Sequence, residues 1–177
     1  MTHMNQVREL IEAPLSREEL ALRYRDLSDD PLFANVPGKI ELDTWGRMLL
    51  SPTNNYRGMI QARLCNRLAD LGGETCINAP IATAMGLFVA DLAWSSTEFI
   101  QSHRDEFSLM VAPEICIEVV SPLSSVKEVQ EKVMAYLSVG AQEVWIVLMQ
   151  SRRCEFYGKQ GLKEQSEFHV DLSRLFD

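Results

Sequence analysis

The sequence is poor in basic residues. It has 17 Lys and Arg against 25 Asp and Glu, which gives a formal net charge of −8 and an isoelectric point near 4.9. Proteins that bind nucleic acid without sequence preference need clustered Lys and Arg for their phosphate contacts. The composition therefore argues against tight non-specific DNA binding, although a small basic patch in an acidic chain stays compatible with a nuclease.

Paired cysteines are missing as well. The four cysteines (Cys65, Cys76, Cys116 and Cys154) are scattered, with no CxxC spacing. Two of them, Cys76 and Cys116, lie in strand-like apolar runs. This usage argues against a zinc site and a disulfide framework, and it favours a reducing cytosol. The three histidines lie in unrelated contexts and indicate neither a catalytic triad nor a metal cluster.

Long apolar stretches are also absent from the sequence. The longest one, VWIVLM, is far too short to cross a bilayer. The N-terminus has no basic segment followed by an apolar stretch, so we expect no signal peptide, no membrane contact and a cytoplasmic location. With 177 residues, 46% of them hydrophobic, the chain is expected to form a single domain with a sizeable core.

Alternating helical and strand patterns predict an α/β (α+β) fold in which helices flank a mixed sheet. Helices are expected over residues 6–27, 54–71, 96–107 and 125–139, and strands over 75–84, 87–94, 114–120, 143–149 and 153–158. Capping-box patterns at Ser16 and Ser125 mark two helix starts. The segment KIELDTWGRMLLSP predicts an additional β-hairpin that turns near residues 44–46.

This order divides the single domain 1–177 into three parts. Residues 1–37 form a helical extension and a loop, residues 38–158 form the core, and residues 159–177 form a tail with a short closing turn.

A lone carboxylate, Glu118, interrupts the apolar strand PEICIEVVSP. Burying a charge in a sheet is costly, so Glu118 requires a partner. One candidate is a divalent cation shared with Asp91 on a neighbouring strand, because Mg²⁺ prefers carboxylate oxygens and water. The other is a buried salt bridge, for example with an arginine of the helix at 54–71. Asp91 taken alone could simply be a solvated strand residue.

Six pieces of the chain carry a resemblance to a known family: GKIELDTWGRMLLSP, the helix after it, VADLAW, APEICIEVVSP, EKVMAYLSVG and EVWIV. In order and spacing they resemble the PD-(D/E)xK nuclease superfamily. Within it, they are similar to a large bacterial family of restriction-endonuclease-like proteins of unknown function. The most specific part is the 14-residue step from Glu118 to Lys132, which is followed by Tyr136, Gly140, Glu143 and Trp145.

The resemblance implies a catalytic set of Asp91, Glu118 and Lys132, with Mg²⁺ or Mn²⁺ on the two carboxylates. The superfamily's common form has a lysine two residues after the Glu, a position that Val120 occupies here. The resemblance assigns that role to Lys132, which would stabilise charge on the phosphate or help deprotonate a water. The alternative for Lys132 is an ordinary surface pair with Glu128, four residues earlier.

Other residues are accessory candidates. The resemblance offers Glu41 as a further metal or water ligand, but a cross-strand pair with Arg47 is an equally good interpretation. Tyr56 stands where many family members have a histidine. The arginines of the helix at 54–71 are candidates for DNA contact, namely Arg57, Arg63 and Arg67. The tryptophans are expected in the core and not as platforms for bases, namely Trp45, Trp94 and Trp145.

Two functions stay open on this basis. The first is a Mg²⁺-dependent endonuclease acting on DNA, which the retained Asp91, Glu118 and Lys132 favour. The second is a catalytically inactive nuclease-fold module for protein interaction or dimerisation, which the acidic composition without a basic stripe favours. We expect a homodimer in either case.

Overall fold

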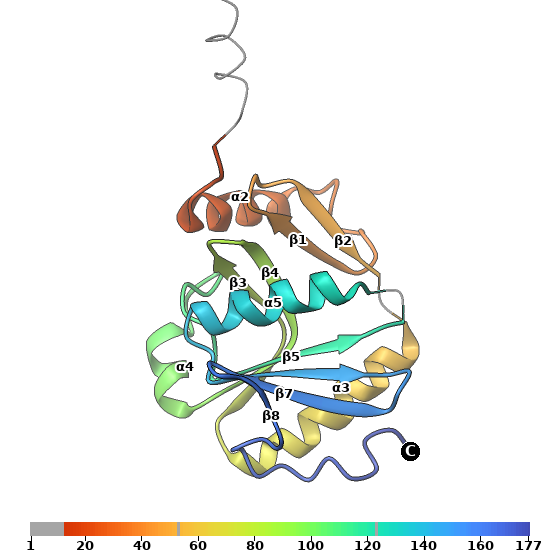
Figure 1. The fold of residues 1–177 in the computed structure, drawn as a ribbon. Helices are drawn as coiled ribbons and strands as arrows, with labels where there is room; N and C mark the ends of the chain where they lie inside the picture. Colours follow the sequence, from red (N-terminus) through yellow and green to blue (C-terminus); the bar gives the residue numbers. More distant parts are fainter. Residues whose placement is uncertain (1–12, 53, 123) are drawn as a thin grey trace, which may run out of the picture.

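A computed structural model describes residues 13–52, 54–122 and 124–177. A mixed sheet forms its centre, in the order β2-β1-β4-β5-β6-β7-β8, with β3 also paired to β4 (Figure 1). The helices are α2 (Arg17–Asp29), α3 (Asn55–Leu68), the short 3₁₀ helix η1 (Ala69–Leu71), α4 (Thr97–His103) and α5 (Val126–Ser138). The strands are β1 (Lys39–Asp43), β2 (Met48–Ser51), β3 (Glu74–Thr83), β4 (Gly86–Ser95), β5 (Ile115–Val120), β6 (Glu143–Leu148), β7 (Arg153–Gly158) and β8 (Gly161–Lys163).

The predicted α+β architecture with its added hairpin is confirmed. Both capping boxes form, at Ser16 before α2 and at Ser125 before α5. The hairpin turns where it was expected, at Gly46, whose φ of 73° suits a residue without Cβ. One or two short helices were expected over 6–27, and the N-terminal part of that range lies outside the described residues. The helix predicted over 96–107 is shorter in the structure, where α4 covers only Thr97–His103. The short strand β8 was not predicted.

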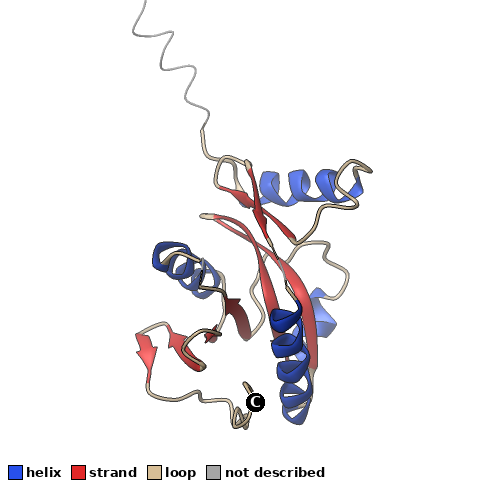
Figure 2. Ribbon diagram, turned by 90° about the vertical axis from the view of Figure 1, so that its right-hand side faces the viewer, coloured by secondary structure: helices blue, strands red, loops and turns tan. Residues whose placement is uncertain are grey.

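Helices lie on both sides of the central strands (Figure 2). One apolar layer lies between these strands and α5, and another lies between them and α3. Strand β6 shows how the sequence builds both layers, because successive side chains of a strand point to opposite faces. Val144 and Ile146 pack on the α5 side, whereas Trp145 and Val147 pack on the α3 side. Both of these strand faces are buried, which explains why the sequence of β6 is a continuous apolar run.

Strand β4 changes its pairing partner halfway along one edge. Its beginning pairs with β1 through Leu42 and Leu87, and its end pairs with β5 through Leu92 and Ile117. The other edge pairs with β3 along almost its whole length. Between the β1 and β5 ladders, residues 88–91 have no strand partner on the first edge in the described part of the chain. The result is a gap in the sheet beside Asp91.

The strand is also irregular at this gap. Phe88 and Ala90 pack under α5, but Leu92 packs under α3, so the in-and-out alternation of β4 changes phase at Asp91. On β3, Asn78 faces this position and has a φ of 57°, a left-handed conformation that few non-glycine residues adopt. Such irregularities are common beside active sites because they re-aim a side chain.

The C-terminal tail returns across the α3 side of the molecule. Leu175 is fully buried there. The expected closing turn is present, because the N–H of Leu175 donates to the Leu172 carbonyl. Two arginines of α3 hold the tail, since Arg63 donates to the Leu175 carbonyl (3.0 Å) and Arg67 to the Ser173 carbonyl (2.6 Å). No helix among the described residues is long and apolar enough to span a membrane.

Two of the three tryptophans lie in the core, as predicted. Trp145 is fully buried, and Trp94 is 8% exposed. The prediction was wrong for Trp45, which is 44% exposed at the hairpin turn. There the guanidinium of Arg47 lies 5.0 Å from the ring centroid, a contact that helps to hold an exposed ring in place.

Candidate active site

An ionic cluster fills the gap in the sheet. Its acids come from three adjacent strands: Glu41 from β1, Asp91 from β4 and Glu118 from β5. Each acid is at most 4% exposed. Its cations are Lys39 from β1, Arg57 from α3 and Lys132 from α5. We call these six residues the ionic cluster.

The cluster replaces the missing ladder of backbone hydrogen bonds. Glu41 accepts the N–H of Val89 (2.8 Å), and Lys39 donates to the Val89 carbonyl (2.7 Å). Asp91 accepts the N–H of Val119 through Oδ2 (2.7 Å). Buried backbone groups without a partner are costly, so these side chains also satisfy the strand edges that diverge here. Backbone bonds of this kind fix the carboxylates in direction as well as in place.

Lys39 is the member of the cluster that the sequence analysis missed. Its ammonium lies 2.8 Å from Asp91 Oδ1 and 3.3 Å from Glu118 Oε2, and the residue is 7% exposed. One signal could have found it: Lys39 stands two residues before Glu41, which places both side chains on the same face of one strand.

Lys132 points into the sheet. Its Nζ lies 2.7 Å from Glu41 Oε1 and 3.4 Å from Glu118 Oε2. The interpretation of Lys132 as a surface partner of Glu128 is therefore wrong. Glu128 instead caps α5 through Ser125. Burial by itself would lower the pKa of Lys132, but the charges of Glu118 and Glu41 outweigh it and raise that pKa above its usual value. Lys132 is thus a firmly protonated ammonium in this arrangement.

Glu118 is an ionised carboxylate in this setting. Burial alone would raise its pKa, but Lys132, Lys39 and a hydrogen bond from Tyr136 lower it below the usual value. The phenol of Tyr136 donates to Glu118 Oε1 (2.7 Å), and burial together with that carboxylate raises the pKa of Tyr136 well above normal. The expected buried salt bridge of Glu118 is present, but its partners are lysines and not an arginine of α3.

That arginine, Arg57, instead pairs with Asp91. Its Nη2 lies 2.6 Å and 2.5 Å from the two carboxylate oxygens. Asp91 is 1% exposed, so the solvated interpretation of this residue is wrong. With Arg57 on Asp91, and Arg63 and Arg67 on the tail, all three arginines have partners in the protein. Their role in DNA contact stays a prediction.

Two accessory candidates have different outcomes. Glu41 does not pair with Arg47, which binds Asp43 (2.6 Å), so the cross-strand interpretation is wrong. Instead, Glu41 lies in the cluster, where Ser51 also donates to its Oε2 (3.3 Å). Tyr56 is 40% exposed on the first turn of α3, and its accessory role stays a prediction.

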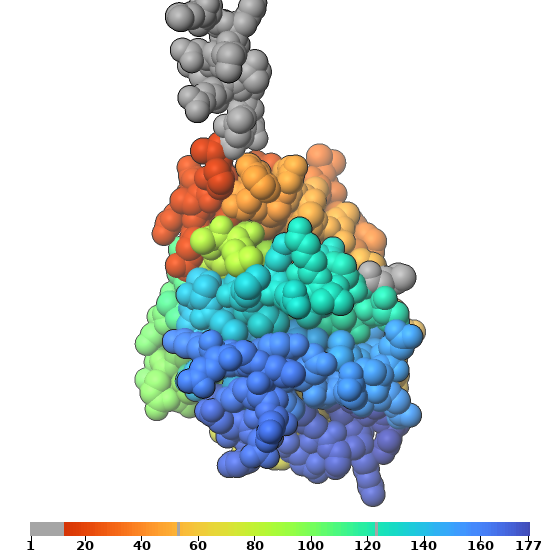
Figure 3. All heavy atoms as spheres, in the orientation of Figure 1, coloured from red at the N-terminus to blue at the C-terminus, as the bar shows by residue number. Residues whose placement is uncertain are grey.

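A cleft of about 350 Å³ leads from the surface to the cluster. Glu41, Glu118 and Lys132 line it, together with the end of the hairpin and the first turns of α5. Figure 3 shows the hairpin (orange) and α5 (cyan) side by side on this face. A smaller recess of about 130 Å³ reaches Lys39 and Asp91. It is also lined by Gly38, Ser51, Arg57, Gln61 and Asn78. Space therefore borders the cluster at two places.

The donor set suits a hard divalent cation. Asp91 and Glu118 both contact the ammonium of Lys39, so their oxygens converge on one point, and Mg²⁺ takes one or two carboxylates plus waters. Each of the cluster's three acids, however, is already in an ion pair. Among the described residues, no group of three or more His, Cys, Asp or Glu is arranged to hold a metal. In this structure, the ammonium of Lys39 occupies the point on which the two carboxylates converge.

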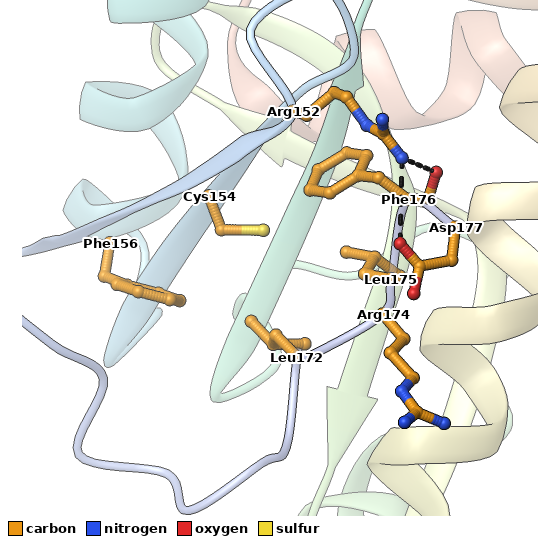
Figure 4. Close-up of a pocket in the computed structure, with 8 residues that line it drawn as sticks. All are labelled: Arg152, Cys154, Phe156, Leu172, Arg174, Leu175, Phe176 and Asp177. Carbon is orange, nitrogen blue, oxygen red and sulfur yellow. Dashed lines mark hydrogen bonds and ion pairs between the residues drawn. The ribbon is translucent and has the colours of Figure 1, made fainter.

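A separate cavity, of about 420 Å³, lies under the C-terminal tail (Figure 4). Its wall combines the apolar side chains of Phe156, Leu172 and Leu175 with charged ones, namely Arg152, Arg174 and Asp177. Arg152 at its edge donates to the Phe176 carbonyl and pairs with Asp177 (3.8 Å). Burial raises the pKa of Cys154 to about 11, so its thiol is uncharged at neutral pH. The ion pair at the edge of this cavity is exposed, with side chains 58% and 69% accessible, whereas the acids of the ionic cluster are buried.

Fold and site together define a restriction-endonuclease-like α+β domain with acids on adjacent core strands. The Uma2 family model, described as "Putative restriction endonuclease", matches residues 24–175, and the chain belongs to this family. The fold is similar to that of a crystal structure described as a putative nuclease belonging to DUF820, from Anabaena variabilis. The TM-score is 0.65 at 16% identity, over 92% of this chain and 98% of the other. No curated protein matches the sequence.

Proposed function

We propose that this protein is a Mg²⁺- or Mn²⁺-dependent endonuclease that hydrolyses phosphodiester bonds in DNA. One observation carries the proposal: acids on adjacent strands and a buried lysine converge at an open cleft, on a fold shared with a nuclease family. Asp91 and Glu118 would hold the cation. A bound cation of this kind polarises the phosphate and activates a water.

The protein's own residues would prepare the site for an anionic substrate. Val119 and Arg57 orient the carboxylate of Asp91, and Tyr136 orients that of Glu118. Lys132 lies at the floor of the cleft with a raised pKa, so it carries a fixed positive charge. This favours stabilisation of the negative charge on the phosphate over deprotonation of a water.

A specific observation supports the alternative, an inactive nuclease-fold module for protein interaction. The cleft is bordered by two further acids, Glu128 and Glu131, which repel a polyanion. We also propose that the protein is a homodimer, in keeping with its family resemblance. Analytical ultracentrifugation at micromolar concentration tests that part separately, and a monomer at all concentrations would contradict it.

Metal binding can be tested without assuming an activity. Mg²⁺ or Mn²⁺ should raise the melting temperature of the wild type by mass action, because a cation that binds only the folded state stabilises it. Asp91→Asn and Glu118→Gln should each erase that increment. Glu143→Gln is the matched control, since it removes another buried strand acid that lies outside the cluster.

Cleavage of supercoiled plasmid with each metal then tests the reaction itself. The wild type should cleave, and Asp91→Asn should not. Equal metal responses in the wild type and both cluster variants would exclude the proposed metal site. A wild type that cleaves with neither metal would favour the non-enzymatic module.

A further inference from the structure

The ammonium of Lys39 lies where a metal ion would have to bind. Its oxygen neighbours come from three residues: the Val89 carbonyl (2.7 Å), Asp91 Oδ1 (2.8 Å) and Glu118 Oε2 (3.3 Å). A fourth oxygen, Glu41 Oε1, lies at 4.0 Å. A buried cation surrounded by carboxylate and carbonyl oxygens has the same environment that a hard metal ion requires.

An ammonium and a divalent cation cannot occupy this position together. Like charges a few ångströms apart repel strongly in a partly desolvated site. The cluster also has no unused negative charge, because Glu41, Asp91 and Glu118 are balanced by Lys39, Arg57 and Lys132. A metal ion would therefore bind only as Lys39 leaves.

The structure provides a place for the displaced side chain. The recess of about 130 Å³ is lined by Lys39 itself and by the polar residues Gln61 and Asn78. Amide oxygens of such residues accept hydrogen bonds from an ammonium. Lys39 could therefore rotate away from Glu118 into the recess, where Gln61 and Asn78 would accept its hydrogen bonds, and Asp91 and Arg57 also line this space.

We infer that Lys39 is a built-in competitor of the metal ion, which occupies the cation position until a divalent ion displaces it. This inference rests on the proposed function, because it places the metal on Asp91 and Glu118. It adds a mode of regulation: the lysine holds the carboxylates in place without metal and sets the metal concentration at which the site fills.

Metal binding by a variant without this ammonium tests the inference. Lys39→Met keeps much of the side-chain volume and removes the charge. Binding of MnCl₂, followed by electron paramagnetic resonance of the free ion, should become at least about tenfold tighter than in the wild type. Lys127→Met is the matched control, because it removes an exposed lysine of α5 (side chain 85% exposed) and should leave the affinity unchanged.

The outcomes separate the inference from the proposed function. If the wild type binds Mn²⁺ and Lys39→Met binds it equally or more weakly, the competitor is excluded while the metal site stands. If only the variant binds, the competitor is supported and a metal-dependent reaction of the wild type is contradicted. If neither binds at millimolar Mn²⁺, both are overturned.

Loss of Lys39 could also unfold the protein, since it leaves buried acids unbalanced. A second pair of variants covers this case. Lys39→Met combined with Glu41→Gln keeps the charges of the cluster balanced, and it is compared with Glu41→Gln alone. The double variant should bind Mn²⁺ at least about tenfold more tightly than the single one. Equal affinity in this pair would overturn the inference.

Discussion

Two buried carboxylates in neighbouring strands have opposite surroundings. Glu143, at the start of β6, is 1% exposed and accepts hydrogen bonds from one lysine and three neutral donors. The neutral donors are the indole of Trp145 (2.7 Å), the hydroxyl of Ser166 (2.6 Å) and the backbone N–H of Glu167 (2.8 Å). Glu118 on β5 has one neutral donor, Tyr136, and two lysines.

The difference shows what distinguishes an anchor from a candidate active site. Three of the four donors of Glu143 come from β8 and the segment directly after it, so this carboxylate ties that part of the chain to the sheet. The lysines of Glu118 are shared with Glu41 and Asp91, and a cleft borders the group. A buried acid alone therefore does not indicate catalysis. A cluster of several acids beside a cleft is the better indication of a candidate active site.

Removing one lysine from each site gives the largest expected contrast. Lys132→Met should lower plasmid cleavage by about a hundredfold or more, as when one preorganised electrostatic donor is removed from a reacting site. Lys163→Met removes the lysine of Glu143 (2.8 Å) and should leave cleavage unchanged. Initial rates with Mn²⁺, at equal concentrations of folded protein, measure both effects.

The same comparison checks how Lys132 acts. Lys132→Arg should restore little activity, because the guanidinium is larger and its geometry differs from that of an ammonium. Circular dichroism should show that all three variants are folded. Full cleavage by Lys132→Met would exclude a catalytic role for this lysine, and equal losses in both methionine variants would remove the distinction between the sites.

The sequence was sufficient for most elements of the fold, because their signals are local. A stripe of apolar residues at Ile60, Leu64, Leu68 and Leu71 predicts a helix over 54–71. The first three are buried on one side of α3, and Leu71, in η1, is half-buried. Apolar runs with turn residues at their ends predict strands such as β6. By contrast, β8 has only three residues, and its pairing with β7 depends on a contact that no local pattern encodes.

The ion pairing of the cluster was less predictable for a related reason. Glu118 could be selected because a charge in an apolar strand is exceptional, and Asp91 because it supplies a second acid on a neighbouring strand and matches the resemblance. The partner of each acid, however, depends on where β4 changes from β1 to β5, and this gap is a property of the whole sheet. Lys39 was overlooked because a lysine at the start of a strand usually faces solvent.

Glu143→Gln should have the next largest effect, on stability. Each oxygen of Glu143 accepts two hydrogen bonds: Oε1 from Lys163 and the Glu167 N–H, and Oε2 from Trp145 and Ser166. The NH₂ group of glutamine would face two donors at one of these positions. We expect a loss of about 1–3 kcal/mol in the free energy of unfolding. That corresponds to about 2–12 °C in melting temperature for a chain of this size.

Metal response should separate this variant from Glu118→Gln. Glu143→Gln should melt earlier but gain as much from Mn²⁺ as the wild type, whereas Glu118→Gln should gain nothing. Differential scanning calorimetry with and without Mn²⁺ measures both quantities. If Glu143→Gln also lost its metal response, Glu143 and Glu118 would both contribute to the metal site. The distinction between an anchor and a candidate active site would then be wrong.

The smallest expected effect is the pH dependence of the contribution of Glu143. Burial alone would raise the pKa of this carboxyl, but the bonds from Lys163, Ser166, Glu167 and Trp145 outweigh it and lower the pKa. A glutamate with a lowered pKa in the folded state stabilises the fold above its unfolded pKa, which is about 4.3. This contribution is lost as the pH falls through the folded pKa, because both states are then protonated.

The difference in unfolding free energy between the wild type and Glu143→Gln should therefore be constant from about pH 7 to pH 5 and shrink below about pH 4. Urea unfolding at several pH values measures it. Glu74→Gln, at an exposed position of β3, is the control and should show little difference at any pH. A free-energy difference that stays constant down to pH 3 would show that the stabilisation by Glu143 comes from packing and not from its charge.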